Sequence, residues 1–132
     1  MPNTGELLDY LEVIGRALPL PHPALPAVGS GYNVLLAGIG GTGIVTVGTI
    51  LGQAAQLDGL ATSLLDLTGL AQKYGAVMTH LRFATDAAAI PSSRLSVGEA
   101  DAVVGCDLIV TAGQEALSKV AAGRSFVVVN TA

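Results

Sequence analysis

The stretch from residue 33 to residue 57 constrains the fold of this chain more than any other part of it. A short apolar run at 34–37 is followed by four glycines within positions 38–43, and then by an uncharged segment that suits a helix. This order predicts a strand, a tight turn and a helix. The glycines fit the spacing G-x-G-x-x-G, in which the first forms the turn, the second admits an anion and the third packs the helix against the strand.

The helix that follows the turn suits an anionic ligand, because a helix N-terminus presents free N–H groups and a partial positive charge. We therefore predict a cofactor-binding turn formed by Gly38, Gly40, Gly41, Thr42 and Gly43. A second interpretation stays open, in which the glycines only allow close packing and bind nothing. Gly48 and Gly52, one turn apart on the same helix, already indicate close packing.

The same 25 uncharged residues, with their Gly48-x-x-x-Gly52 motif, could also form a membrane span with a small-residue dimer face. Against this, a Gly-Gly pair near the start of the stretch forms helix poorly, and no basic cluster flanks it. We expect no membrane segment.

The composition indicates one domain, part of whose surface is covered by other protein. The 132 residues are 51% hydrophobic and only 12% charged, so we expect a partner or further sequence to cover part of the surface. A net charge of -4 and the absence of a Lys/Arg run argue against nucleic acid and anionic membranes. Cys106 is the only cysteine, which predicts a reducing, cytoplasmic compartment. We expect it to be buried as a small apolar group.

The N-terminal region reads as a separate attachment. Residues 1–18 predict an amphipathic helix, with Leu7, Leu11, Ile14 and Leu18 on one stripe. Residues 19–31 predict a linker, because four prolines in eight residues precede a glycine-rich end. The α/β domain then occupies residues 32–132.

The remaining strands predict a Rossmann-like, three-layer domain with a mostly parallel sheet, incomplete at its C-terminal end. We expect strands at 61–66, 76–84, 107–111 and 125–130, a short turn at 70–75, and helices at 98–106 and 114–122. The strand at 125–130 should be buried, because it is apolar in its middle. In the strand at 76–84, Met78, His80 and Arg82 share one face. We expect that face to be solvated or an interface, with anion binding as the alternative.

Asp66 is a further candidate for cofactor binding. It ends the predicted strand 61–66 and lies 23 residues after Gly43, near the acidic position that binds ribose in dinucleotide-binding domains. The alternative is an aspartate that caps the turn at 68–69. No metal site is predicted, because His80 has no second histidine or cysteine at ligand spacing.

Several linked motifs in residues 32–132 resemble the gamma domain of the 2-oxoacid:ferredoxin oxidoreductases, which act on pyruvate, ketoisovalerate or indolepyruvate. The fused indolepyruvate enzymes are the most similar. The motifs are NVLL (33–36) before GIGGTG (38–43), LTGLAQKYG (67–75), THLR (79–82), AD (100–101), GCDL (105–108) and VVNT (128–131).

The resemblance implies part of a larger enzyme. Such enzymes decarboxylate 2-oxoacids oxidatively with thiamine diphosphate, magnesium and coenzyme A, and pass electrons through iron–sulfur clusters to ferredoxin. The indolepyruvate group converts arylpyruvates to acyl-CoA. This piece should be catalytically inert, because it has one cysteine and lacks the Gly-Asp-Gly motif of thiamine enzymes. The glycine turn would contact a phosphate of coenzyme A or lie at an interface.

The resemblance also implies partners, namely the other domains or subunits of the oxidoreductase, with ferredoxin for the whole complex. The N-terminal helix and linker would connect to a preceding thiamine-binding module. An unfinished sheet edge also predicts self-association. Two other hypotheses remain: a free-standing NAD- or FAD-binding Rossmann domain, and a purely structural interaction domain with an empty turn.

Overall fold

The computed structural model describes residues 5, 9, 12–13, 21–69 and 75–132. The helix predicted at 1–18 and the turn predicted at 70–75 lie outside the described residues, apart from single positions. Residues 21–31 are a mostly exposed segment without helix or strand before the first strand, and the proposed division at residues 18 and 31 stays a prediction.

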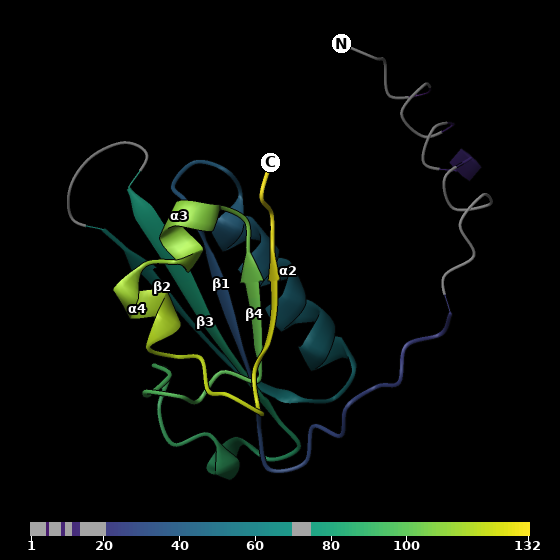
Figure 1. Cartoon of the computed structure of the whole chain (residues 1–132). Coiled ribbons are helices and arrows are strands. Elements are labelled where there is room, and N and C mark those ends of the chain that lie inside the picture. Colours follow the sequence, from purple (N-terminus) through teal and green to yellow (C-terminus); the bar gives the residue numbers. More distant parts are fainter. Residues whose placement is uncertain (1–4, 6–8, 10–11, 14–20, 70–74) are drawn as a thin grey trace.

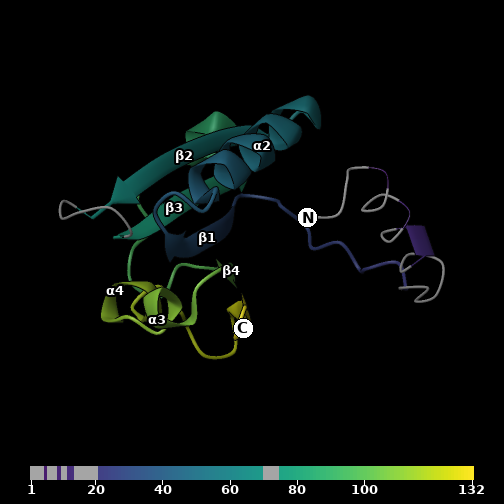
Figure 2. The same cartoon turned by 90° about the horizontal axis from the view of Figure 1, so that it is seen from above.

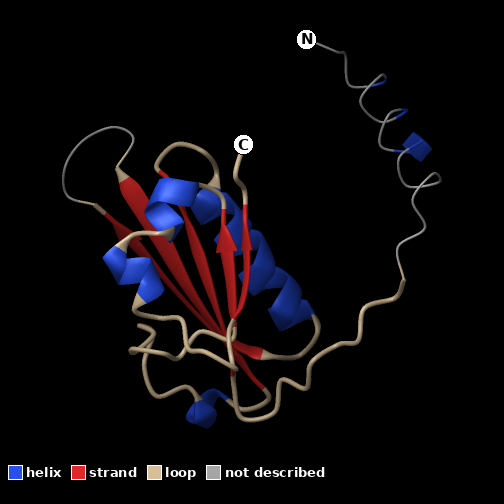
Figure 3. Cartoon of the chain, in the orientation of Figure 1, coloured by secondary structure: helices blue, strands red, loops and turns tan. Residues whose placement is uncertain are grey.

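The described core contains both strands and helices (Figures 1 and 3). The elements are β1 (Tyr32–Ile39), α2 (Ile44–Leu57), β2 (Ala61–Thr68), β3 (Ala76–Ala84), a 3-10 turn η1 (Ala87–Ala89), β4 (Ala102–Gly105), α3 (Leu108–Thr111), α4 (Gln114–Leu117) and β5 (Phe126–Val129). Helix α2 lies on one face of the sheet, and α3 and α4 lie on the other (Figure 2). The α/β class is confirmed.

The sheet has the order β2-β3-β1-β4-β5 and is mixed, so the prediction of a mostly parallel sheet is wrong. Strands β4 and β5 run parallel to β1, whereas β3 is antiparallel to both β1 and β2. The reason is the short connection between β2 and β3. Seven residues suffice for an antiparallel return but not for the crossover of a dozen or more that parallel neighbours need. β3 also pairs with β1 and so lies between β1 and β2.

Each face of the sheet has its own apolar core, because alternate residues of β1 point to opposite faces. One cluster lies toward α3 and α4 and comprises Leu35, Ala37, Met78, Leu95, Ala100, Val103 and Ala116. The other lies toward α2 and comprises Val34, Leu36, Ile44, Val77 and Leu81. β1 is therefore the buried centre on which the glycine turn is mounted.

Helix α2 packs closely on β3 through a glycine. A Cβ atom added to Gly48 would lie 2.6 Å from Thr79 Cγ2, whereas one added to Gly52 would meet Leu64 at an ordinary 3.7 Å. Both glycines are buried against the sheet. The close packing expected from the Gly48-x-x-x-Gly52 spacing is confirmed.

The C-terminal third corrects several predictions. The helix expected at 98–106 and the strand expected at 107–111 are wrong, because β4 occupies Ala102–Gly105 and α3 occupies Leu108–Thr111. Asp107 decides this locally, since its side chain accepts a hydrogen bond from the Val110 N–H at 2.8 Å and caps α3. Cys106 is exposed at this junction rather than buried.

The last two elements also differ from expectation. Helix α4 is a single turn, shorter than the predicted 114–122. β5 is at the edge of the sheet and largely exposed instead of buried, with Phe126 and Val128 77% and 70% exposed. No helix in the described part of the chain is long and apolar enough to cross a membrane.

Candidate functional site

The glycine turn lies at the carboxyl end of β1, where it joins α2. Gly38 is buried and makes room for the helix, because a Cβ there would lie 2.5 Å from Ile44 Cδ1. Gly41 and Gly43 have φ values of +82° and +92°, in the left-handed region that favours glycine. The Gly40 N–H donates to the Gly75 carbonyl at 2.9 Å and ties the turn to the start of β3.

The first turn of α2 leaves its backbone donors available. Helical hydrogen bonding begins with the Val47 N–H, which donates to the Gly43 carbonyl at 2.9 Å, so the N–H groups of the first three helical residues have no partner within the helix. Gly43 offers no side-chain cap, and the first turn has no acidic residue. The Thr42 hydroxyl donates to the Ile39 carbonyl at 2.5 Å, which fixes the turn without capping the helix.

A cavity of about 290 Å³ adjoins these donors. Its lining comes from the turn, the first residues of α2 and the start of β3: Ile39, Gly40, Gly41, Gly43, Ile44, Val45, Thr46 and Val77. Sequence reasoning identified the glycines but missed Ile44, Val45, Thr46 and Val77, which an apolar run directly after the turn could have indicated. The lining has no lysine, arginine or acidic group, so the arrangement can bind an anion through backbone N–H groups but offers no acid or base.

Asp66 does not join the turn. β3 lies between β1 and β2, which separates the Asp66 strand from the turn strand by roughly 10 Å. The Asp66 carboxylate instead accepts a hydrogen bond from the Thr79 hydroxyl at 2.5 Å. The Gly69 N–H donates to the Ala76 carbonyl at 3.0 Å, so the hairpin is closed by backbone rather than by Asp66. Ribose binding by Asp66 therefore stays a prediction that this placement does not favour.

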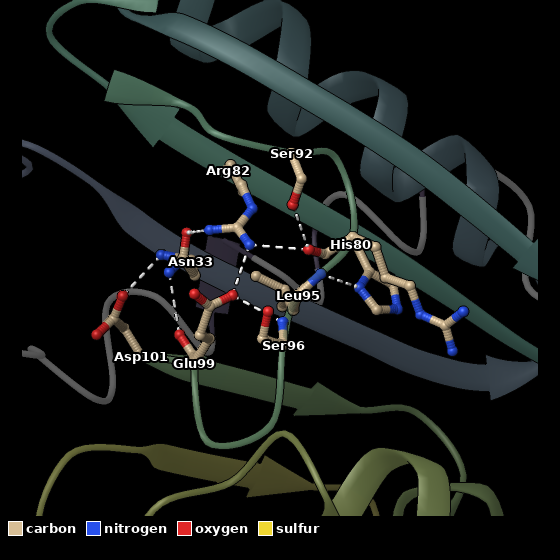
Figure 4. Close-up of polar contacts among 9 residues, drawn as sticks. Asn33, His80, Arg82, Ser92, Leu95, Ser96, Glu99 and Asp101 are labelled. Carbon is tan, nitrogen blue, oxygen red and sulfur yellow. Dashed lines mark hydrogen bonds and ion pairs between the residues drawn. The ribbon is translucent and has the colours of Figure 1, made fainter. Parts of the chain in front are cut away.

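The face of β3 that carries His80 and Arg82 is interior, which corrects the expectation of a solvated or interface face. Both residues are buried, at 0% and 5% exposure, beneath the segment between η1 and β4. The Arg82 guanidinium donates to Glu99 Oε2 at 2.5 Å and to the Arg94 carbonyl at 2.8 Å (Figure 4). The alternation of the strand placed Arg82 on one face with Met78 and His80. A buried arginine needs an acidic partner, so this pattern could have led to a search for one such as Glu99.

Asn33 and Asp101 extend this network to β1. The Asn33 side chain donates to the Glu99 carbonyl at 3.0 Å, and the Asn33 N–H donates to Asp101 Oδ2 at 2.8 Å (Figure 4). Hydrogen bonding from the Ser96 N–H, together with the Arg82 guanidinium, lowers the pKa of Glu99 below its usual value. The network holds the segment between η1 and β4 over β3, but Arg82 Nε is buried without a hydrogen-bond partner among the described residues.

His80 is held in one orientation by the backbone. Its Nδ1 accepts a hydrogen bond from the Leu95 N–H at 2.9 Å, so the neutral ring carries its proton on Nε2 (Figure 4). Burial lowers the pKa of His80 from 6.5 to about 4, with the charges of Lys119 and Arg94 acting in the same direction. No group of three metal-ligating side chains occurs among the described residues, so His80 has no metal partners there.

These features define an α/β domain with an anion-ready turn at the carboxyl end of its central strand. The chain belongs to the pyruvate ferredoxin/flavodoxin oxidoreductase family, whose model matches residues 33–132. The match begins one residue after β1 starts and includes the rest of the sheet. It confirms the resemblance to the gamma domain of the 2-oxoacid:ferredoxin oxidoreductases.

Two curated relatives are similar over part of this chain. The indolepyruvate oxidoreductase subunit IorB of Thermococcus kodakarensis is 34% identical over 73 residues, which cover 55% of this chain and 35% of that protein. The protein of the same name from Pyrococcus horikoshii matches with the same identity and coverage. The chain thus spans about a third of the length of the curated relatives it matches.

A solved structure has a similar fold. The pyruvate oxidoreductase subunit PORC of Thermotoga maritima superposes with a TM-score of 0.56 at 18% identity, covering 74% of this chain and 49% of that one. At this identity the likeness concerns the fold alone.

Proposed function

We propose that this chain is a domain of an indolepyruvate-type 2-oxoacid:ferredoxin oxidoreductase and is catalytically inert by itself. The observation that carries the proposal is the family match over residues 33–132, together with 34% identity to the IorB subunits. The whole enzyme would convert arylpyruvates to acyl-CoA and pass the electrons to ferredoxin. Its other domains or subunits would be the partners of this one, and a cytoplasmic location stays a prediction.

Among the residues that the structure describes, the glycine turn alone fits one of the groups that such an enzyme uses. An iron–sulfur cluster needs a set of cysteine ligands, and the sequence has Cys106 alone. No described cluster of side chains would hold the magnesium ion that accompanies thiamine diphosphate. The glycine turn, by contrast, has free backbone donors and an apolar cavity beside them, which suit a phosphate and the chain attached to it.

We infer that the glycine turn contacts coenzyme A. When bound in the whole enzyme, coenzyme A supplies the thiol that accepts the acyl group. The N–H groups of Ile44, Val45 and Thr46 would hold a phosphate oxygen, while Thr42 keeps the turn closed against Ile39. The lining lacks a basic side chain, so these backbone dipoles supply the attraction and binding by this domain alone should be weak.

Calorimetric titration of the purified chain with coenzyme A, NAD and FAD tests this assignment. Gly40→Asp places a negative charge at the turn, and Gly40→Ala is the matched control. A Cβ at Gly40 lies 3.4 Å from Val77 Cγ2 and 3.5 Å from the Gly75 carbonyl, so alanine needs at most a slight adjustment there. We expect coenzyme A to bind the original chain and the alanine variant but not the aspartate variant.

The other outcomes contradict the assignment in different ways. Tight binding of NAD or FAD would favour the free-standing dinucleotide-binding domain. Coenzyme A binding that survives Gly40→Asp would place the ligand away from the turn. Failure of all three ligands to bind would leave the turn as a packing device, and the domain as a partner surface in the oxidoreductase.

A further inference from the structure

A second cavity, of about 220 Å³, lies at the amino end of β1. Its walls come from the entry into β1, the C-terminal part of β3, the end of η1 with the two residues after it, and the turn before β5. Because β1 has eight residues, the glycine turn at its other end is roughly 26 Å away. The cavity is therefore separate from that turn, and its ligand is independent of the proposed contact with coenzyme A.

The polar part of the lining is cationic. Arg82 and Arg124, two of the six basic residues of the chain, both line the cavity, and none of the described acidic residues does. Asn33 and Ser30 add a side-chain amide and a hydroxyl. Because the chain as a whole has a net charge of -4, these local charges and not a general attraction would draw an anion to this place. The polar lining therefore suits an anionic group.

The buried guanidinium of Arg82 has more donors than the described residues satisfy. A guanidinium carries five N–H groups. Nη2 donates to the Arg94 carbonyl and to Glu99, whereas Nη1 donates only to Asn33 Oδ1, at a long 3.3 Å (Figure 4). Nε has no partner at all among the described residues. Since Asn33 also lines the cavity, Nη1 lies on the cavity side, where a ligand could supply the acceptor that a buried donor ordinarily has.

Arg124 is held in place by one of its nitrogens and keeps the others available. Its Nε donates to Asp101 Oδ1 at 2.8 Å, and its side chain is 47% exposed. The Asp101 carboxylate also accepts the Asn33 N–H at 2.8 Å, so it anchors Arg124 beside the start of β1. The two Nη groups of Arg124 have no hydrogen-bond partner among the described residues. They form the planar fork that binds a carboxylate through two parallel hydrogen bonds.

We propose that this cavity binds a small organic carboxylate with a ring-sized apolar body. The Nη groups of Arg124 bind the carboxylate, and Arg82 Nη1 donates to it from below. The apolar part of the lining, which includes Phe83 and Ile90, contacts the body of the ligand. The volume of about 220 Å³ exceeds the roughly 150 Å³ of a cavity that holds benzene, so a ring with a carboxylate on a short arm fits. An inorganic anion would leave the apolar lining unused.

Titration of the ¹⁵N-labelled chain with phenylacetate, followed by NMR, tests the proposal. We expect saturable shifts of the backbone amides of Gly31, Phe83 and Ala89, and none at Gly41 or Gly43. A dissociation constant of the order of millimolar is expected for a ligand with so few atoms. Phenylacetamide, which has the same shape without the charge, and acetate, which has the charge without the ring, should each bind at least about tenfold more weakly.

Two arginine variants give the matched comparison. Arg124→Gln should weaken phenylacetate binding about tenfold, because it removes a charged fork. Arg94→Gln is the control: Arg94 is also exposed and also paired with a carboxylate, that of Glu115 at 2.9 Å, but it does not line the cavity. We expect it to leave the affinity within about twofold of the original, since it removes only an exposed pair.

Four outcomes would overturn the proposal. The first is the absence of saturable shifts at about 10 mM phenylacetate, well above the expected dissociation constant. The second is equal binding of phenylacetamide, which would show that the arginines are not used. The third is equal weakening by Arg124→Gln and Arg94→Gln, and the fourth is a set of shifts confined to the glycine turn. None of these results decides whether the turn contacts coenzyme A, which the calorimetric titration tests separately.

Discussion

The buried histidine predicts a loss of stability at mildly acidic pH. His80 is 0% exposed, and its pKa falls from 6.5 to about 4 because burial disfavours the charged ring. In the unfolded chain the ring takes up a proton as the pH falls below 6.5, whereas the folded chain resists protonation until about pH 4. The stabilisation is therefore complete above pH 6.5 and is lost as the pH falls toward 4.

The two pKa values set the magnitude of this loss. Their separation corresponds to roughly 3 kcal/mol in total, of which about 2 kcal/mol is lost between pH 7 and pH 5. The acidic residues with shifted pKa values, Glu99 and Glu115, have values below 4.5 and so contribute mainly at lower pH. The other histidine, His22, is exposed in the proline-rich segment. The interval from pH 7 to pH 5 thus isolates His80.

Urea denaturation at several pH values measures the effect, and His80→Asn is the matched control. The asparagine Oδ1 can take the place of Nδ1 and accept the Leu95 N–H, while the titrating ring is removed. The variant should be less stable at pH 7 through lost packing, but its free energy of unfolding should change little between pH 7 and pH 5. A flat profile for the original chain, or the same slope in both proteins, would refute the reasoning.

Three further predictions concern packing, the buried network and self-association. Gly48→Ala should destabilise the chain by about 1–3 kcal/mol in thermal denaturation, because the added Cβ contacts Thr79. Gly52→Ala, the control, should be neutral or stabilising by up to about 1 kcal/mol. Equal effects of the two substitutions would contradict the close approach of α2 to β3. Arg82→Met should lower the free energy of unfolding by roughly 1–3 kcal/mol, because it breaks the buried network. Arg94→Met removes an exposed ion pair and should lower it by under about 1 kcal/mol. The opposite order would be evidence against the interior role of Arg82. The open, apolar edge of β5 should make the chain partly oligomeric by light scattering, and Val127→Lys should reduce this association; a sharp monomer peak for the original chain would disprove it.

Sequence patterns predicted the parts of the fold that depend on neighbouring residues. The strand, turn and helix around residues 38–43 follow from glycine conformation and an apolar run, and both are local. The end of α2 at Asp58 and Gly59 was predictable for the same reason, since Gly59 adopts a φ of +79°. The glycine turn was therefore predictable, although the use of the Gly40 N–H to bind Gly75 was not, because that partner lies 35 residues away.

Errors arose where distant contacts decide the structure. The short apolar runs on either side of Asp107 fit either element, and pairing of Val103 with Leu35 of β1 selects the strand for 102–105. The position of β3 between β1 and β2 took Asp66 away from the turn, a consequence of sheet order that periodicity does not encode. His80 and Arg82 were misassigned to an outer face because the segment that buries them follows later in the chain.

The measurement that tests the central claim most directly is the activity of the complex that contains this protein. A tagged copy in its native host would be purified with its partners, and ferredoxin reduction would be followed with coenzyme A and either an arylpyruvate or pyruvate. The proposal predicts coenzyme A-dependent reduction that is faster with the arylpyruvate. If the pure complex fails to reduce ferredoxin with either 2-oxoacid, the proposal is contradicted.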